Sequence, residues 1–253
     1  ERSMTEKPLV SVIMPAFQAE KYIKQAIESV WTQDVPLELI VIDDCSSDNT
    51  RGVLEPYMKR TDFHYIRNKD NIGAAASRNK GIDAANGDFI AYLDSDDWWE
   101  TGKLMKQLEI LRKTGCVMCS TGREMMKPDG SSTGKKVGVA FIVTYKELLK
   151  HNSINCSSVL IRKDVAMEFP MCYDKSHEDY ITWLKVLRKY GRCVGINYPY
   201  LKYRLSEGGK SRNKIKSARM TFQVYRYMGY GRIKSSIFFL SYAVHGIIKY
   251  IGI

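Results

Sequence analysis

The first hundred residues alternate between short apolar runs and longer segments whose apolar residues recur every three or four positions. The apolar runs are of strand length and lie at 9–14, 37–42, 63–66 and 88–93. Helical spacing occupies 19–33 and 74–85, and Ser46–Thr50 offers N-caps for a further helix. Strands separated by helices in this way predict βαβ units and a parallel sheet.

The pattern continues less regularly through the second half of the chain. It predicts helices at 101–113, 144–150 and 179–190, and strands at 116–125, 137–143, 157–162 and 193–201. The turn Lys127–Gly130 predicts a hairpin in which 137–143 is the returning strand. We therefore expect an α/β fold, a Rossmann-like α/β/α sandwich with a mostly parallel central sheet, over residues 4–211. Glu1-Arg-Ser, before Met4, is typical of a remnant of an expression vector and is left out of the fold prediction.

The tail at 212–253 differs in kind from the rest. Residues 213–230 predict a basic helix with aromatic side chains, and most faces of the following segment are apolar. Its uncharged run, Ser235–Val244, is about half of the ~20 residues that span a bilayer. Two interpretations stay open: an amphipathic helix lying in the interface of an anionic membrane, or a helix packed on its own domain or in a homodimer.

Composition and charge limit the cellular compartments and the classes of partner that fit the chain. The chain has 253 residues, 44% of them hydrophobic, and a net charge of +11 with the basic residues crowded toward the C-terminus. Such charge suits nucleic acid, an anionic membrane or a phosphate-bearing substrate. The six cysteines show no disulfide spacing, and no signal-like segment opens the sequence, so we expect free thiols and a cytoplasmic protein.

Three carboxylates, Asp94, Asp96 and Asp97, directly follow the strand at 88–93. Oxygen ligands in such a cluster suit Mg²⁺ or Mn²⁺, although a solvated turn that caps the next helix has the same composition. Pro15–Phe17 and Asp43–Asp44 also fall at strand ends. In open α/β sheets ligands bind beyond the carboxyl ends of the strands, so the coincidence favours a site.

Five motifs in order resemble the inverting family 2 glycosyltransferases of the GT-A fold: Val10–Phe17, Val41–Asp48, Asn71–Asn79, Leu93–Asp97 and His177–Tyr180. The likeness covers about residues 9–205. It implies a nucleotide-sugar-binding half at 9–97, an acceptor-binding half at 98–211, and a UDP-sugar donor.

The resemblance also assigns roles on the donor side. Pro15, Ala16, Phe17 and Asp43 would hold the nucleoside, and Asp44 would support their loop. A strand end with one buried aromatic is the plainer interpretation of Ala16 and Phe17.

The resemblance continues through the next two motifs. Arg78 would reach the diphosphate or brace the aspartates. Asp94 and Ser95 would contact the donor, Asp96 would bind Mn²⁺ or Mg²⁺, and Asp97 would assist through water or orient the loop.

Asp179 matches the base that takes the acceptor proton, with Glu178 as the second choice or a substrate contact. Trp183 could stack on a sugar or pack in the core. Where many members carry a histidine this chain has Ser206, so Arg204, Lys210 or Ser211 would have to contact the diphosphate instead. The Gln-x-x-Arg-Trp signature of processive synthases is absent, which favours transfer of a single sugar.

Together these features predict a peripheral enzyme on the inner face of the cell membrane that makes envelope polysaccharide. It would move one hexose or N-acetylhexosamine to a glycan acceptor, expected to be lipid-linked. UDP-glucose and UDP-galactose fit equally well. A nucleic-acid-binding protein is the rival from another class, but it leaves the acidic motifs unexplained, so no nucleic-acid partner is expected. A nucleotidyltransferase or an inactive sugar-nucleotide binder remains an alternative within the fold.

Overall fold

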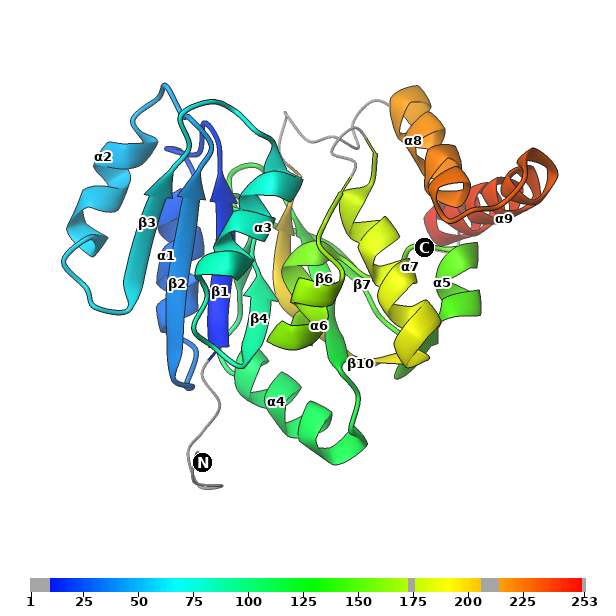
Figure 1. The fold of residues 1–253 in the computed structure, drawn as a ribbon, viewed down its shortest axis with the longest axis horizontal. Helices are drawn as coiled ribbons and strands as arrows, with labels where there is room; N and C mark the ends of the chain where they lie inside the picture. The colour runs from blue at the N-terminus through cyan, green and yellow to red at the C-terminus, as the bar shows by residue number, and fades with distance from the viewer. Residues whose placement is uncertain (1–9, 173–175, 206–213, 252–253) are drawn as a thin grey trace.

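One mixed sheet forms the centre of the molecule in the computed structural model (Figure 1). The structure describes residues 10–172, 176–205 and 214–251. Within them the strands are β1 (Val10–Ala16), β2 (Leu37–Asp43), β3 (Phe63–Arg67), β4 (Phe89–Tyr92), β5 (Trp98–Trp99), β6 (Met118–Met126), β7 (Ser132–Val137), β8 (Ile142–Thr144), β9 (Leu160–Arg162) and β10 (Arg192–Arg204).

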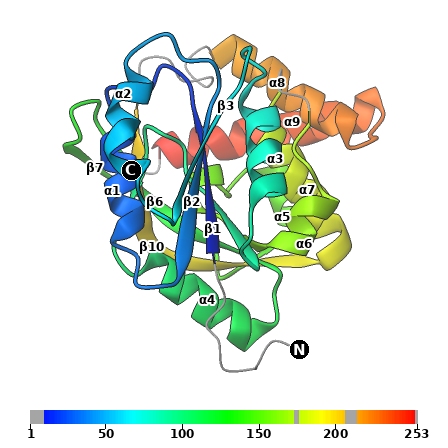
Figure 2. The same ribbon diagram turned by 60° about the vertical axis from the view of Figure 1, so that its left-hand side comes forward.

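Helices cover both faces of this sheet. They are α1 (Ile23–Trp31), α2 (Thr50–Leu54), α3 (Ala74–Ala84), α4 (Lys103–Thr114), α5 (Tyr145–Lys150), α6 (Lys163–Glu168), α7 (Glu178–Tyr190), α8 (Lys214–Tyr227) and α9 (Arg232–Ile251), with 3₁₀ turns η1 (Glu55–Tyr57) and η2 (Cys156–Ser158). Figure 2 shows α1 and α2 on one side of β1 and β2, and α3 with α5–α7 on the other. The expected α/β sandwich is confirmed.

The first half of the sheet is parallel, in the order β3-β2-β1-β4. Side chains alternate across it: Val12 and Met14 pack toward α1, whereas Ile13 packs toward α3. Gly81 brings α3 very close, because a Cβ there would lie 2.6 Å from Ile13 Cγ2 and 2.7 Å from Ile42 Cδ1. The carboxyl ends of β1, β2 and β4 therefore meet at one rim, as the sequence predicted.

The sheet continues without a break into the second half. β9 runs antiparallel between β4 and β6, and β6 pairs in parallel with β10. β10 is longer than the predicted 193–201, because it also pairs with β5 and β8. The division expected at residue 97 thus falls inside one continuous sheet.

The predicted hairpin has the wrong returning strand. β7 at Ser132–Val137 returns along β6, while Ile142–Thr144 pairs with β10 instead. The turn is tight, with Gly130 at φ 87° and the Lys127 N–H donating to Ser131 O at 2.8 Å, so the strand resumes at once. Its residues are polar and exposed, and an apolar pattern could not reveal it. The two-residue β5 was missed because it is too short to show a pattern, and α6 was missed because it follows β9 without an intervening turn.

Both helices predicted for the tail are present in the described residues, and they form a hairpin against α5 and α7 (Figure 1). No helix in the described part of the chain is long and apolar enough to cross a membrane. One side of the hairpin joins the main core through Val224, Tyr225 and Met228. Packing on its own domain, one of the two open interpretations, is therefore correct for that side.

Candidate active site

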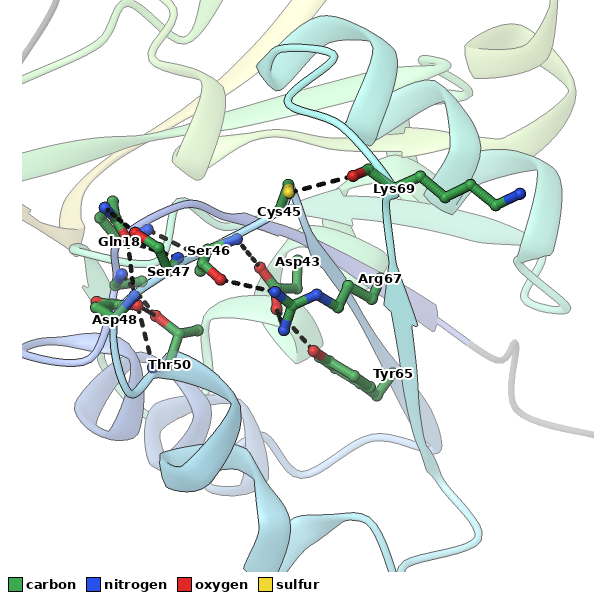
Figure 3. Close-up of polar contacts among 11 residues, drawn as sticks. Gln18, Asp43, Cys45, Ser46, Ser47, Asp48, Thr50, Tyr65, Arg67 and Lys69 are labelled. Carbon is green, nitrogen blue, oxygen red and sulfur yellow. Dashed lines mark hydrogen bonds and ion pairs between the residues drawn. The ribbon is translucent and has the colours of Figure 1, made fainter.

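The loops after β1 and β2 are fastened together at the rim of the sheet (Figure 3). Gln18 Oε1 accepts from the backbone N–H groups of Ser47 and Asp48, both at 3.0 Å, and the Gln18 N–H donates to Ser46 Oγ at 3.1 Å. Gln18 and Cys45 adopt positive φ, 51° and 64°, which is rare for residues with side chains. Sequence patterns do not mark either residue, so this element of the site was missed.

Asp43 also supports the loop after β2, through hydrogen bonds of its carboxylate. Its Oδ1 accepts from the Ser46 N–H at 2.9 Å, and its Oδ2 accepts from the Tyr65 hydroxyl at 2.7 Å and lies 3.5 Å from Arg67 Nη1 (Figure 3). Its side chain is fully buried. The predicted nucleoside contact is therefore not available to Asp43 in this arrangement. The exposed cation beside it is Arg67, which no sequence motif marks.

Asp44 supports the loop that leads into α3, whereas the prediction gave its side chain the loop at Pro15–Phe17 and Asp43. Its carboxylate accepts from the N–H groups of Ile72 and Gly73 at 2.9 and 2.8 Å, and from Asn68 Nδ2 at 2.8 Å. These bonds hold Gly73, at φ 88°, directly before α3 begins. Asp44 thus fixes where α3 starts relative to β2.

The end of β1 presents an aromatic face to solvent. Phe17 is 51% exposed, whereas Ala16 is buried and Pro15 is half-buried. The interpretation of Phe17 as a buried aromatic is wrong. An exposed ring at this rim can stack on a nucleobase, since every base offers a π-face.

Arg78 lies at the centre of the site and joins its two halves. From α3 its Nη2 donates to Asp94 Oδ1 at 2.6 Å, and its Nη1 donates to Glu178 Oε1 at 3.1 Å. Arg78 and Glu178 are buried, while Asp94 is about one-third exposed. Of the two predicted roles, bracing the carboxylates is the one that the geometry shows.

The acidic turn after β4 concentrates negative charge at the rim. Asp94, Ser95 and Asp96 are half-buried, and Asp97 is only 2% exposed. Asp97 Oδ1 accepts from the Arg204 N–H at 2.9 Å, while no described residue donates to its buried Oδ2. Burial, together with the charges of Asp96 and Asp94, raises the pKa of Asp97 well above its ordinary range.

These features fit a divalent cation, which would supply the positive charge that the buried carboxylate lacks. Among the described residues, no group of three or more acidic, histidine or cysteine side chains is placed to hold an ion unaided. Mg²⁺ and Mn²⁺ commonly complete their coordination with water and substrate phosphate, so the fit is to a shared site.

Arg204 supports the acidic turn and is not free to contact a diphosphate. Its Nε donates to Asp96 O and its Nη1 to Pro128 O, both at 2.8 Å, and its Nη2 donates to Gln25. The guanidinium also lies between the rings of Tyr22 and Trp98. The predicted substitute role is wrong for Arg204, and Lys210, Ser211 and Ser206 lie outside the described residues.

The first turn of α7 carries the candidate base. Asp179 is half-buried, and burial followed by the charge of Glu178 raises its pKa, against the opposing effect of His177 and Arg78. Glu178 is held by Arg78, which leaves Asp179 as the better base. Trp183 is fully buried and packs on Tyr92 at 5.7 Å, so it offers no face to a sugar.

One further supporting residue comes from the turn η2. Ser157 Oγ accepts from the Asp94 N–H at 3.1 Å, and Ser157 O accepts from Trp99 Nε1 at 2.7 Å. A serine in a short polar turn carries no sequence signal for this role. Ser157 therefore holds the backbone of the acidic turn at Asp94, whose side chain is held by Arg78.

Known proteins similar to this chain are glycosyltransferases. Residues 11–168 match the family model described as Glycosyl transferase family 2. The chain is 39% identical over 222 residues to the putative teichuronic acid biosynthesis glycosyltransferase TuaG of Bacillus subtilis, which covers 87% of this chain and 88% of that protein. It is 36% identical to WfgD of Escherichia coli, named a UDP-Glc:alpha-D-GlcNAc-diphosphoundecaprenol beta-1,3-glucosyltransferase, over 96% of this chain and 95% of that one.

Solved structures show the same fold at low identity. S. aureus TarS in complex with UDP-GlcNAc superposes with a TM-score of 0.70 at 20% identity, over 91% of this chain and 70% of that chain. The mannosyltransferase PcManGT from Pyrobaculum calidifontis, solved with GDP-Man and Mn²⁺, has a TM-score of 0.71 at 15% identity, over 93% and 70% of the two chains.

Proposed function

This chain belongs to glycosyl transferase family 2, and we propose that it moves a single hexose from a UDP-sugar to a hydroxyl of a lipid-linked glycan with inversion at the anomeric carbon. The observation that carries the proposal is the double ion pair of Arg78 with Asp94 and Glu178. It holds the donor-side acidic turn and the base-bearing turn of α7 at one rim, where direct displacement needs them together.

Asp179 acts as the general base. It accepts the proton of the acceptor hydroxyl as that oxygen attacks the anomeric carbon and the bond to UDP breaks. A base works best with a pKa near the operating pH, and the raised pKa of Asp179 moves it in that direction. General-base catalysis of this kind contributes about 10²–10⁴-fold.

The donor lies across the rim of the sheet. Phe17 stacks on the uracil, and the loop held by Gln18 and Asp43 surrounds the nucleoside. Asp96 holds Mn²⁺ or Mg²⁺, with Asp94 and Asp97 beside it. The ion, when bound, neutralises charge on the departing diphosphate as a Lewis acid. A solved neighbour of the same fold contains Mn²⁺ together with GDP-Man, which supports the use of a divalent cation.

The most informative relatives favour UDP-glucose as the donor. WfgD and WfaP, at 36% and 32% identity, are both named as glucosyltransferases acting on GlcNAc-diphosphoundecaprenol with a β-1,3 product. A β product is what inversion of an α-linked sugar nucleotide gives. We propose the same donor and an acceptor of the same class here, at the inner face of the cell membrane where such lipids are extended.

The donor assignment is tested by measuring UDP release from UDP-glucose, UDP-galactose and their N-acetyl forms, with Mn²⁺ and a GlcNAc-diphospholipid acceptor. We expect acceptor-dependent UDP release with UDP-glucose, and a loss of at least about 10²-fold in Asp179→Asn with UDP binding retained. Turnover of Asp179→Asn near the wild-type rate would remove Asp179 from the mechanism. Release of inorganic diphosphate in place of UDP would identify a nucleotidyltransferase.

A further inference from the structure

The α8–α9 hairpin has an inner face that is built into the catalytic domain. Phe238 lies 5.5 Å from Tyr225 and 4.9 Å from Tyr230, and Phe239 lies 6.3 Å from Phe222, all between ring centroids. The Tyr225 hydroxyl donates to Leu149 O of α5 at 2.8 Å. The hairpin is therefore fixed relative to the sheet and is not a loose tether.

The opposite face of α9 is an apolar stripe. Ile233, Ile237, Leu240 and Val244 are spaced by four, three and four residues, which places them on one side of a helix. They are 80%, 61%, 66% and 45% exposed. We call these four residues the outer stripe. An amphipathic helix of a single domain normally buries its apolar side, but α9 is apolar on two sides and buries only one.

The charged side chains of the hairpin that carries the outer stripe have one sign. Residues 214–251 contain seven Lys and Arg and no Asp or Glu. Arg232 and Lys234 flank the start of the stripe, and Arg226 is exposed on α8. A hollow of about 600 Å³ lies at the turn between the helices, lined by residues from Gly229 to Lys234. Apolar residues flanked by cations match the interface of an anionic bilayer.

We propose that the outer stripe of α9 docks in the plane of an anionic lipid bilayer. The docking itself does not depend on the proposed function. Only its expected use, the capture of a lipid-linked acceptor, rests on that function. A second copy of this chain is the less favourable occupant, because a twofold contact through α9 would bring two sets of cations together.

Docking through this face sets the position of the catalytic base relative to the membrane. Tyr180, the residue after Asp179, is fully buried against Tyr225 of α8 and Tyr242 of α9, with ring centroids 6.4 and 6.3 Å away. Ser176 Oγ also donates to Met220 O of α8 at 3.1 Å. One rigid unit thus carries the lipid-facing stripe on one side and holds the base-bearing turn on the other.

The test is co-sedimentation of the purified chain with vesicles of phosphatidylglycerol and phosphatidylcholine, compared with phosphatidylcholine alone. We expect binding to the anionic vesicles that weakens with salt, and a loss of at least about tenfold in Ile237→Glu/Leu240→Glu. Met105→Glu changes an exposed apolar residue of α4, a helix at the bottom of Figure 1 that lies apart from α8 and α9, and it should bind as the wild type does. Thermal unfolding and UDP binding of each variant serve as folding controls.

Every outcome bears on the docking face without a measurement of sugar transfer. Absence of wild-type binding at low salt overturns the proposal, as does a stripe variant that binds like the wild type. If sedimentation velocity shows a dimer that Ile237→Glu/Leu240→Glu dissociates while vesicles bind neither protein, α9 is instead an interface between copies. A failure of the glycosyltransfer assay would leave the vesicle result unaffected.

Discussion

At the scale of single residues, the site depends on carboxylates whose environments differ. Asp43, Asp44 and Glu178 are buried and hydrogen-bonded or ion-paired, so they hold structure. Asp179 keeps a half-exposed side chain whose pKa is raised. The sequence motif presents Glu178 and Asp179 as adjacent equals, and only the contact with Arg78 separates their roles.

The pH dependence of transfer should report the influence of Glu178 on the base. Asp179, the proposed base, must be deprotonated to accept a proton, so the rate should fall as the pH falls through its raised pKa. Removing the negative charge of Glu178 lowers the pKa of Asp179, so the acid limb of kcat against pH should move to lower pH in Glu178→Gln. Asp164→Asn, a distant exposed carboxylate, is the control. A limb that stays in place would contradict the assignment of Asp179.

Lys103 should make the free energy of unfolding depend on pH. It is fully buried in α4, with Nζ 2.8 Å from Gln107 Oε1, and burial lowers its pKa from 10.5 to about 7. Between these values the unfolded chain binds more protons, so this group makes stability rise with pH, by up to about 1.4 kcal/mol per pH unit.

Lys103→Met should therefore gain on the wild type at pH 7 and lose that relative gain toward pH 10, as measured by urea unfolding. Lys106→Met, on the exposed side of the same helix, provides the comparison. If the free energies of unfolding of wild type and Lys103→Met changed in parallel with pH, the pKa of Lys103 would not be lowered in the folded state.

At the scale of elements, the approach of α3 to the sheet positions Arg78. Gly81 lies one helical turn beyond Arg78 and leaves no room for a side chain against Ile13 and Ile42. The two-residue β5 and the polar strand β7 were not predicted from the sequence, because periodicity needs length and an apolar face. The long amphipathic helices and buried strands were all predicted.

Gly81→Ala should destabilise the fold even though alanine favours a helix. The gain in propensity is about 1 kcal/mol, and the overpacking cost is about 1–3 kcal/mol in a close-packed core. We expect a lower free energy of unfolding in urea and weaker UDP binding, since α3 must shift. Asp83→Ala, exposed in the same helix, should be near neutral. A stabilised Gly81→Ala would show that Ile13 and Ile42 can move aside.

At the scale of the whole molecule, two halves share one sheet and one ion-pair network. The sequence motifs located most of the rim, because each is a contiguous stretch at the end of a strand or the start of a helix. They could not reveal Tyr65, Arg67 or Ser157, which contribute single atoms from elements far along the chain. Nor could they show that Arg204 bonds to the acidic turn and that Trp183 is buried in the core.

Ligand binding across the rim should stabilise the whole molecule. UDP with Mn²⁺ at about a hundredfold above its Kd contributes about 2.7 kcal/mol, or roughly 5–10 °C in Tm for a chain of this size. Chelation by EDTA should remove most of this shift, and Asp96→Asn should make the shift insensitive to Mn²⁺. A full shift with UDP and EDTA would argue against a metal at Asp96.

The packing of Tyr180 against Tyr225 and Tyr242 also affects the order in which parts of the protein fold during translation. Residues 10–97 can form the parallel strands and the nucleotide side of the rim early, since N-terminal units generally fold first. Tyr242 comes from the last helix of the described chain and is needed to close around Tyr180. A nascent chain on the ribosome could therefore hold a sugar nucleotide before its base is set, and catalysis would begin only once α9 has emerged.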